Sequence, residues 1–519
     1  MGLVSVQIPA GVYRHGTDYD SKDRWIDANL VRWENNALRP IGGWVQRTSV
    51  PTVEGESPVA LTVPNGPDPS DPSYSDTGGV PRGVIAWDDN SNNPRLAAGT
   101  YNALFHFNAV GTRTDITPAG FIGGDVNSAE NLGYGGYFFG VGVYGEERPN
   151  NNIFDEATSW SLDTWGEYLV GVSTSDQRIY EWQLNPAAKA VQIANSPNCR
   201  ALVVTEDRFL MALGAGTGVL NPRLVKWCDR EDNTDWVASA VNEAGEIELQ
   251  TNGQILSGVN TRGRVLILTS VDAHAGTYSG PPAVYGFEKI GENCGTVSRN
   301  SCIAVDEGAF WMSYNGFFAY NGSAVSDLPC EVQDYVFDDI NRLELSKITV
   351  VDNSQYNEIW WFYPSVNSLN NDRYVAYDYK ENVWNIGRLD RSAAVDVGVF
   401  TVPIWFDAFG NIWDHETAFD HQGEIPYAET GPISIGNGQN IMKVTELISD
   451  EETLGDVTTT WKTRFYPTGQ EYQYGPFTMA NPTGVRFTGR QVRMRVDGVN
   501  LVKWKVGTMR INVEQGGER

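Results

Sequence analysis

Few residues of this 519-residue chain are of the types and at the spacings that chemistry requires. The five histidines are scattered, and none belongs to an HExxH zinc motif. No serine stands in a GxSxG pattern, and no cysteine has a recognisable base partner. A catalytic triad assembles only in the folded chain, so these patterns lend a hydrolase no support without excluding one. The histidines are His15, His106, His274, His415 and His421.

Paired carboxylates are plentiful, and two of them at the mouth of a channel would suffice for a glycosidase. Adjacent acidic residues are more commonly solvated turns, however. The sialidase-type Asp box is absent, because Ser161–Trp165 lacks its glycine. An enzyme is therefore the weaker hypothesis. The acidic groups are Asp88/Asp89, Asp229/Glu231/Asp232, Asp338/Asp339 and Asp450/Glu451/Glu452.

Two stretches match ligand-binding motifs only in part. Residues 140–145, GVGVYG, fit GxGxxG, but a dinucleotide site needs that pattern between a strand and a helix, and Glu146–Pro149 supplies two anions and a helix breaker. The run from Asp88 begins like a calcium loop. Asn93 stands where that loop needs Gly, and Gly99 where it needs a bidentate Glu, so an Asx-rich turn is favoured. We expect no cofactor and no metal.

The chain carries 65 Asp and Glu against 38 Lys and Arg, a formal net charge of −27. A protein that grips nucleic acid over a broad surface needs Lys and Arg to neutralise phosphates, so this balance argues against one. An anionic body is compatible with a surface that DNA passes without sticking, and solubility is the plainer explanation. There is no N-terminal targeting signal and no apolar run near the roughly 20 residues of a spanning helix.

The five cysteines are an odd number without a CxxC pair. This usage favours free, mostly buried thiols in a chain made in a reducing cytosol, and it argues against zinc. Cys294 and Cys302 are close enough in sequence to pair across a hairpin, which spacing alone does not establish.

Basic residues gather near the C-terminus. Val492–Val496 and Val502–Val506 both alternate apolar and basic residues, so pairing them as a hairpin would give one apolar and one basic face. In so acidic a chain, this face favours contact with an acidic patch on a neighbouring copy. An ordinary solvated face and a DNA-gripping face are the alternatives. The candidate assembly face is Arg490, Arg493, Arg495, Lys503 and Lys505.

Short strands must position all these residues. With 54 Gly, 17 Trp and 23 Tyr, the composition suits strands joined by tight turns. Cys302–Gly322 reads as three strands, Ile303–Val305, Ala309–Ser313 and Phe317–Tyr320, separated by glycine turns. Such a unit is stable only when packed against similar units, as in a propeller. Looser repeats of it, about 40 to 60 residues apart, predict an all-β fold: a β-propeller of six or seven blades with few short helices.

The predicted organisation has four parts. Residues 1–50 form N-terminal strands that join the propeller, and residues 51–82 form a Pro-rich exposed loop. Blades occupy residues 83–425, with a Gly- and Asn-rich excursion at 121–159 and the clearest helix at 331–341. Residues 426–519 form an additional C-terminal β domain.

Several stretches together resemble the tail nozzle (tail hub) proteins of short-tailed bacteriophages (podoviruses). The likeness runs over nearly the whole chain except residues 51–82, and none of its pieces is catalytic. The stretches are Arg24–Trp33, Leu38–Trp44, Asp115–Pro118, Val225–Asp229, Thr234–Trp236, Trp311–Ser313, Gly316–Phe318, Glu358–Pro364 and Gly489–Gly507.

The resemblance implies a non-enzymatic virion structural protein, synthesised in the host cytoplasm and placed in the tail. Such proteins form a hexameric ring below the tail adaptor proteins, gate and conduct double-stranded DNA during ejection, and hold fibres or spikes. Two other hypotheses stay open on the residues. One is a carbohydrate-binding or carbohydrate-cleaving propeller that recognises a receptor, and the other is a minor head or connector protein.

Overall fold

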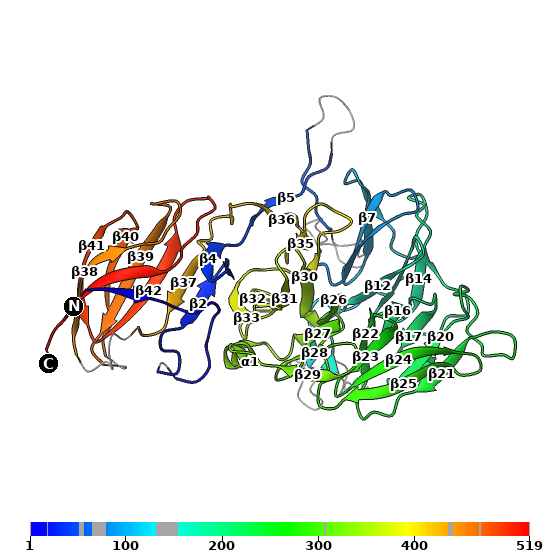
Figure 1. Ribbon diagram of the computed structural model, residues 1–519. Helices are drawn as coiled ribbons and strands as arrows, with labels where there is room; N and C mark the ends of the chain where they lie inside the picture. The colour runs from blue at the N-terminus through cyan, green and yellow to red at the C-terminus, as the bar shows by residue number, and fades with distance from the viewer. Residues whose placement is uncertain are drawn as a thin grey trace, which may run out of the picture.

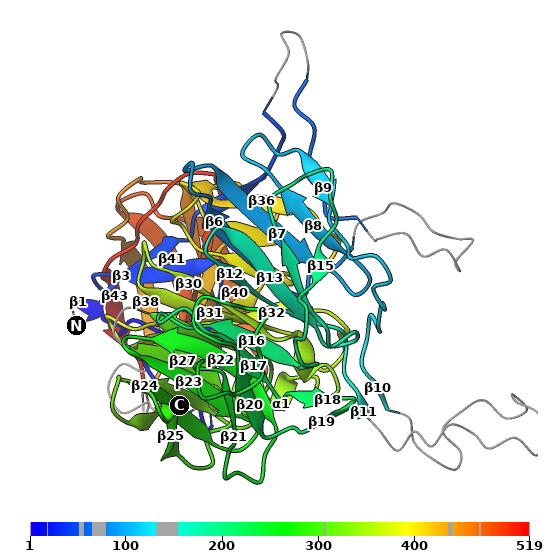
Figure 2. The same ribbon diagram turned by 90° about the vertical axis from the view of Figure 1, so that its right-hand side faces the viewer.

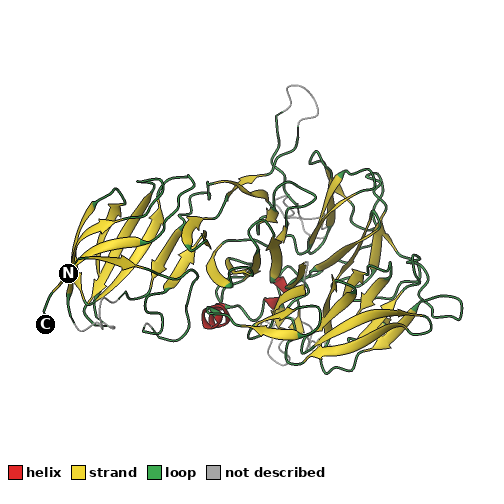
Figure 3. Ribbon diagram, in the orientation of Figure 1, coloured by secondary structure: helices red, strands yellow, loops and turns green. Residues whose placement is uncertain are grey.

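The computed structural model describes residues 2–17, 19–50, 57–64, 79–130, 154–305, 308–433, 440–466 and 469–517. Within these ranges the only helical elements are α1 (Gln333–Asp339) and the 3₁₀ turn η1 (Leu345–Lys347), and strands make up most of the rest (Figure 3). Figure 1 shows two lobes, a β-propeller and a β-sandwich, which confirms the predicted fold class. Among the described residues, no helix is long and apolar enough to cross a membrane.

The propeller has seven blades, each a four-stranded antiparallel sheet numbered here in chain order. The blades are, from inner to outer strand: blade 1, β6 (Val84–Asp88), β7 (Pro94–Gly99), β8 (Leu104–Phe107), β9 (Arg113–Asp115); blade 2, β12 (Trp160–Trp165), β13 (Tyr168–Ser173), β14 (Ile179–Trp182), β15 (Val191–Gln192); blade 3, β16 (Ala201–Val204), β17 (Leu210–Leu213), β20 (Leu224–Trp227), β21 (Gly245–Glu248); blade 4, β22 (Ile255–Thr261), β23 (Arg264–Thr269), β24 (Ala273–Gly280), β25 (Val284–Gly291); blade 5, β26 (Cys302–Val305), β27 (Gly308–Met312), β28 (Phe317–Tyr320), β29 (Val325–Leu328); blade 6, β30 (Thr349–Asn353), β31 (Glu358–Tyr363), β32 (Arg373–Asp378), β33 (Val383–Arg388); blade 7, β34 (Ala393–Val395), β35 (Ile404–Phe406), β36 (Ile412–Ala418), β5 (Gly43–Gln46).

The ring of blades is closed by both ends of the chain. The inner strands contact one another in the order β6, β12, β16, β22, β26, β30, β34, and β34 returns to β6. Blade 7 takes its outer strand, β5, from the N-terminal region, where Trp44 pairs with His415 and Gln46 with Trp413. Blade 7 is therefore incomplete without a segment more than 350 residues away in sequence.

Burial on both faces explains why the blade strands read as continuous apolar runs. On β31, Trp360 packs against Trp405 of blade 7, with ring centroids 5.3 Å apart. Its neighbour Trp361 points the other way and packs against Phe317 of blade 5, at 4.9 Å. Successive side chains of a strand face opposite sides of the sheet, so a blade between two others needs large apolar residues at every position.

The smaller lobe is a β-sandwich that also uses both chain ends. Its sheets follow the orders β1-β43-β38-β41 and β2-β37-β42-β39-β40, and Trp461 packs on Phe487 between them at 5.1 Å. The strands are β1 (Leu3–Val6), β2 (Trp25–Asn29), β37 (Tyr427–Thr430), β38 (Met442–Ile448), β39 (Val457–Arg464), β40 (Tyr472–Thr478), β41 (Thr483–Gly489), β42 (Gln491–Gly498) and β43 (Met509–Gln515). The first 30 residues thus contribute strands to the sandwich, and only β5 reaches the propeller.

Three two-stranded ribbons lie outside these sheets. One is the hairpin between the lobes, and the other two extend from the propeller (Figure 1; Figure 2, with the propeller toward the viewer). They are β3 (Val31–Glu34) with β4 (Ala37–Pro40), β10 (Ala129–Glu130) with β11 (Phe154–Asp155), and β18 (Gly216–Thr217) with β19 (Val219–Leu220).

Two local expectations need correction. The predicted hairpin between Val492–Val496 and Val502–Val506 is wrong, because β42 pairs with β37 and β39 and residues 502–506 form no strand. Trp504 instead buries its ring beside Gly498. The Pro-rich segment is not exposed throughout, since Leu61 and Val63 are buried among apolar residues of blades 1 and 7. Residues 51–56 and 65–78 lie outside the described residues.

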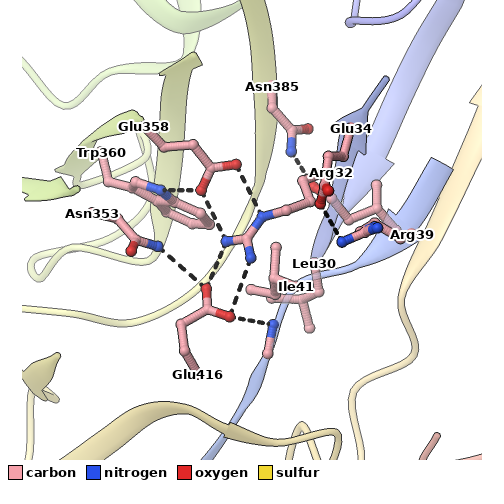
Figure 4. A network of polar contacts seen from close by, with 12 residues as sticks. Leu30, Arg32, Glu34, Arg39, Ile41, Asn353, Glu358, Trp360, Asn385 and Glu416 are labelled. Atoms are coloured by element: carbon pink, nitrogen blue, oxygen red, sulfur yellow. Dashed lines mark hydrogen bonds and ion pairs between the residues drawn. The ribbon is translucent and has the colours of Figure 1, made fainter. Parts of the chain in front are cut away.

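A buried ion-pair network fastens the β3–β4 hairpin to the propeller (Figure 4). The guanidinium of Arg32, 3% exposed, lies 2.9 Å from a carboxylate oxygen of Glu358 in blade 6 and 2.6 Å from one of Glu416 in blade 7. Tyr356 covers the guanidinium at 3.6 Å, and Gly42 N donates to Glu416 at 2.7 Å. Burial raises the pKa of Glu358 although Arg32 lies beside it. One cation therefore joins the hairpin to two blades.

Candidate functional site

The motif-like stretches and paired carboxylates do not converge on one site. The GxGxxG-like residues 140–145 lie outside the described residues. Asp89 accepts hydrogen bonds from Ser91 N and Asn93 N and pairs with Arg95 at 2.7 Å, which confirms an Asx turn. These contacts, the backbone bond from Asn93 first, hold the pKa of Asp89 below its usual range. The remaining pairs lie on α1, on the blade 3 loop and in the sandwich, on three separate elements.

The histidines and cysteines assemble no reactive centre among the described residues. His106, His274, His415 and His421 are buried, and burial lowers the pKa of each. All five cysteines are free, so Cys294 and Cys302 do not pair. Within the described ranges, no group of three or more His, Cys, Asp and Glu side chains could hold a metal ion.

The candidate assembly face is divided by the fold. Arg493 and Arg495 project from the outer face of β42, where Glu471 lies 3.5 Å from Arg493 and Asp497 lies 2.7 Å from Arg495. Arg495 also stacks on the Tyr427 ring at 3.6 Å. These arginines are therefore balanced by carboxylates of their own chain. Arg490 precedes β42, and Lys503 and Lys505 lie in the loop that follows it.

A pocket on the sandwich was not foreseen from sequence. It has a volume of about 540 Å³, and the Arg490 guanidinium lies 5.7 Å from the Tyr466 ring at its side. Phe465, Tyr466 and Tyr472 are partly exposed there. Its other described lining residues are Ile441, Gly469 and Gln470.

A second unforeseen feature lies at one end of the propeller axis. We call it the axial cluster: Arg82, Glu156, Arg200, Arg299, Glu344 and Lys347. Five of the six stand within four residues of the start of an inner strand. The inner strands of a propeller run in the same direction along the axis, so residues that precede them gather at one mouth. No single segment signals the cluster, because each charge is isolated in sequence.

Hydrogen bonds of the axial cluster cross the axis. Asn300 Nδ2, before blade 5, donates to Arg82 O, before blade 1, at 3.0 Å. Arg299 Nη1 donates to Glu156, before blade 2, at 2.7 Å, and its Nε donates to Arg200 O, before blade 3, at 3.2 Å. None of these blades is a neighbour of blade 5. The mouth is thus closed by polar contacts, and B-DNA, whose major groove alone is about 12 Å wide, cannot pass through one propeller.

The segment between blades 1 and 2 braces this closure. Ser128 N donates to Glu344 at 3.1 Å, and Lys347 Nζ donates to Asn127 Oδ1 at 2.7 Å. Lys347 also pairs with Glu344 at 2.8 Å. The base of the β10–β11 ribbon is therefore bonded to the start of blade 6.

The cations of the axial cluster outnumber its anions. Arg299 pairs with Glu156 and Lys347 with Glu344, but among the described residues Arg82 and Arg200 have no carboxylate oxygen within 4.0 Å. Burial lowers the pKa of Arg82, which is 4% exposed, to about 10. Burial, with Arg82 nearby, lowers the pKa of Lys347 to about 8. Cations that cost this much to bury mark a site short of negative charge.

Comparison with known proteins reaches the fold and no further. The sequence matches no family model and no curated protein. A streptogramin B lyase structure is similar at 8% identity with a TM-score of 0.38, covering 65% of this chain and 93% of the lyase. BamB from Moraxella catarrhalis is similar at 8% identity and a TM-score of 0.36, covering 79% of this chain and all of that one. A chain of a nidogen/laminin complex follows at 10% identity and 0.29, covering 48% and 86%.

Proposed function

We propose that this protein is a non-enzymatic structural subunit of an oligomeric ring, of the kind formed by the tail nozzle proteins of short-tailed bacteriophages. In this proposal the ring conducts and gates DNA and holds fibres or spikes. The sequence stretches that resemble that family support it. So does the failure of the described histidines, cysteines and paired carboxylates to converge on a reactive centre.

The distribution of charge is the observation that carries the proposal. Residues 31–426, which contain the propeller, carry 51 Asp and Glu against 24 Lys and Arg, whereas residues 427–519 carry 10 against 11. The acidic excess thus belongs to the propeller and not to the sandwich. A wall of this sign repels phosphates, so DNA would move along it without the release cost of each Lys–phosphate contact.

The closed axis decides where such a passage would lie. Since polar contacts bridge the propeller mouth, the conduit in this proposal runs between several copies of the chain and not through one propeller. A head-to-tail arrangement of identical subunits closes into a ring when its rotation allows.

Light scattering of the full chain at high concentration, with negative-stain images, tests the proposal. We expect ring-shaped oligomers with a central opening, and no retention of double-stranded DNA at 50 to 200 mM salt. Monomers at every concentration, or tight salt-dependent DNA binding, would contradict it.

A receptor-binding role is the second candidate, and the sandwich pocket favours it. Phe465, Tyr466 and Tyr472 offer exposed aromatic faces beside Arg490, an arrangement that suits a sugar ring with an acidic group. Screening against host surface polysaccharides tests this role. Saturable binding that Tyr466→Ala abolishes would support it, and no binding would remove it.

A further inference from the structure

We propose that the axial cluster binds a small oxyanion, phosphate or sulfate in size and charge, with Arg82 as its principal ligand. This inference rests on the propeller mouth alone and does not depend on the proposed function. No contact or charge from the sandwich enters it.

The first argument is charge balance. The cluster brings four cations and two carboxylates together at the closed mouth, and the two carboxylates are taken up by Arg299 and Lys347. Arg82 is 4% exposed and faces no carboxylate at ion-pair distance among the described residues. A buried charge without a partner costs several kcal/mol. An anion at this place would repay that cost.

The second argument is the supply of hydrogen-bond donors. The side chain of Arg82 makes one hydrogen bond, from Nη2 to Asn370 Oδ1 at 2.9 Å, which leaves the rest of a five-donor fork unused. None of its N–H groups is both fully enclosed and unbonded, so the free ones face accessible space. A guanidinium fork matches the spacing of two oxygens on one phosphate or sulfate.

The third argument is the surrounding field. Lys347 interacts electrostatically with Arg82, and Arg200 with Arg299, so an anion at Arg82 relieves repulsion between like charges. Arg200 is the second cation without a carboxylate, and its side chain donates only to Gln254 Oε1, at 3.2 Å. Neutral amides satisfy geometry without compensating charge. The same electrostatics reject cations and disfavour uncharged ligands.

Isothermal titration calorimetry of the full chain with inorganic phosphate, at ionic strength held constant with sodium chloride, tests the inference. We expect one phosphate per chain, with sulfate competing and chloride not competing. Arg82→Gln should weaken binding at least about tenfold, the loss of a single charge-assisted contact, and Arg200→Gln should weaken it less. A deoxynucleoside monophosphate in a parallel titration asks whether the site also accepts a phosphate ester.

A matched control separates this site from general salt effects. Arg262 is exposed on the turn between β22 and β23, at the opposite end of the inner strand of blade 4. Arg262→Gln should leave phosphate affinity unchanged, and the stabilisation that phosphate gives most proteins should be equal in all variants. If Arg82→Gln does not fold, Arg82→Lys, which keeps the charge without the fork, replaces it. Absence of binding, or equal affinity in wild type and both Arg82 variants, would overturn the proposal.

Discussion

The propeller and the sandwich use similar strands but treat charge in different ways. On the outer sheet of the sandwich, Lys462 lies 2.7 Å from Glu429, and Arg495 lies 2.7 Å from Asp497. At the propeller mouth, Arg82 and Arg200 have no such partner among the described residues. The sandwich balances its charges within the chain, whereas the propeller leaves an acidic surface and a cationic mouth. Unbalanced charge therefore marks the parts of the molecule that have something outside the chain to meet.

The network that joins the two regions should show the largest effect. Arg32→Met leaves Glu358 and Glu416 buried without their cation, so we expect a loss of about 3–5 kcal/mol in the free energy of unfolding. Guanidinium denaturation followed by tryptophan fluorescence measures it. The matched control adds Glu358→Gln and Glu416→Gln, which removes the unpaired charges and should restore part of the loss. A loss below about 1 kcal/mol for Arg32→Met would show that the lobes are held by packing alone.

An unpaired carboxylate in the propeller wall should give the next largest effect. Burial raises the pKa of Asp163 to about 6, although Val204 N and Thr164 N donate to it. The folded state thus holds this proton more tightly than the unfolded state. Stability from Asp163 is therefore complete below about pH 4 and is lost as pH rises through 6.

Asp163→Asn is neutral at every pH and should stabilise the protein by about 1–3 kcal/mol at pH 8, with the gain vanishing toward pH 4. Melting temperatures at pH 4.5, 6 and 8 measure it. In the sandwich, Asp497→Asn breaks the contact with Arg495 and should slightly destabilise the protein at all three. A gain from Asp163→Asn that does not depend on pH would refute the assignment.

Lys503 and Lys505 sharpen the comparison at the level of assembly. They lie outside the internally balanced sheet face, so charge on them remains for a neighbouring copy. If the acidic propeller of another subunit is their partner, Lys503→Glu with Lys505→Glu should weaken self-association about tenfold. Arg495→Gln, already neutralised by Asp497, should change it less than twofold. Sedimentation velocity compares the two, and equal effects would remove the two lysines from the assembly face.

The smallest effect should come from an exposed pair of the sandwich. Lys443 and Glu514 are 3.0 Å apart, and both are more than half exposed. Lys443→Gln should therefore cost no more than about 0.5 kcal/mol. A loss comparable with that of Arg32→Met would contradict the distinction between paired surface charges and the buried joint.

Local patterns predicted the blades well. The three runs read in Cys302–Gly322 became β26, β27 and β28 with boundaries shifted by at most one residue, because alternation and Asn-Gly turns are local signals. The same alternation misled at Val502–Val506. There Trp504 is held by burial beside Gly498, and Val506 forms a bridge to Leu38 at the joint. Tertiary packing outweighed a clean local pattern.

The candidate sites could not be predicted for a related reason. Arg82, Glu156, Arg200 and Lys347 are separated by tens of residues and meet only because their strands start at one mouth. The neutralisation of Arg495 by Glu429 and Asp497 likewise depends on β37 lying beside β42. The overall acidity was readable from composition, but its confinement to the propeller required knowing which strands form each lobe.

The strand β5 has a consequence for biosynthesis. Translation delivers it among the first 50 residues, yet its partner β36 emerges only after residue 418. The sandwich waits in the same way, because β1 and β2 need β43 and β37. Both lobes therefore stay unfinished until nearly the whole polypeptide has left the ribosome, and contacts between such distant segments form slowly. A ribosome that stops early releases a chain with open sheet edges, which is prone to aggregate and unable to enter a particle.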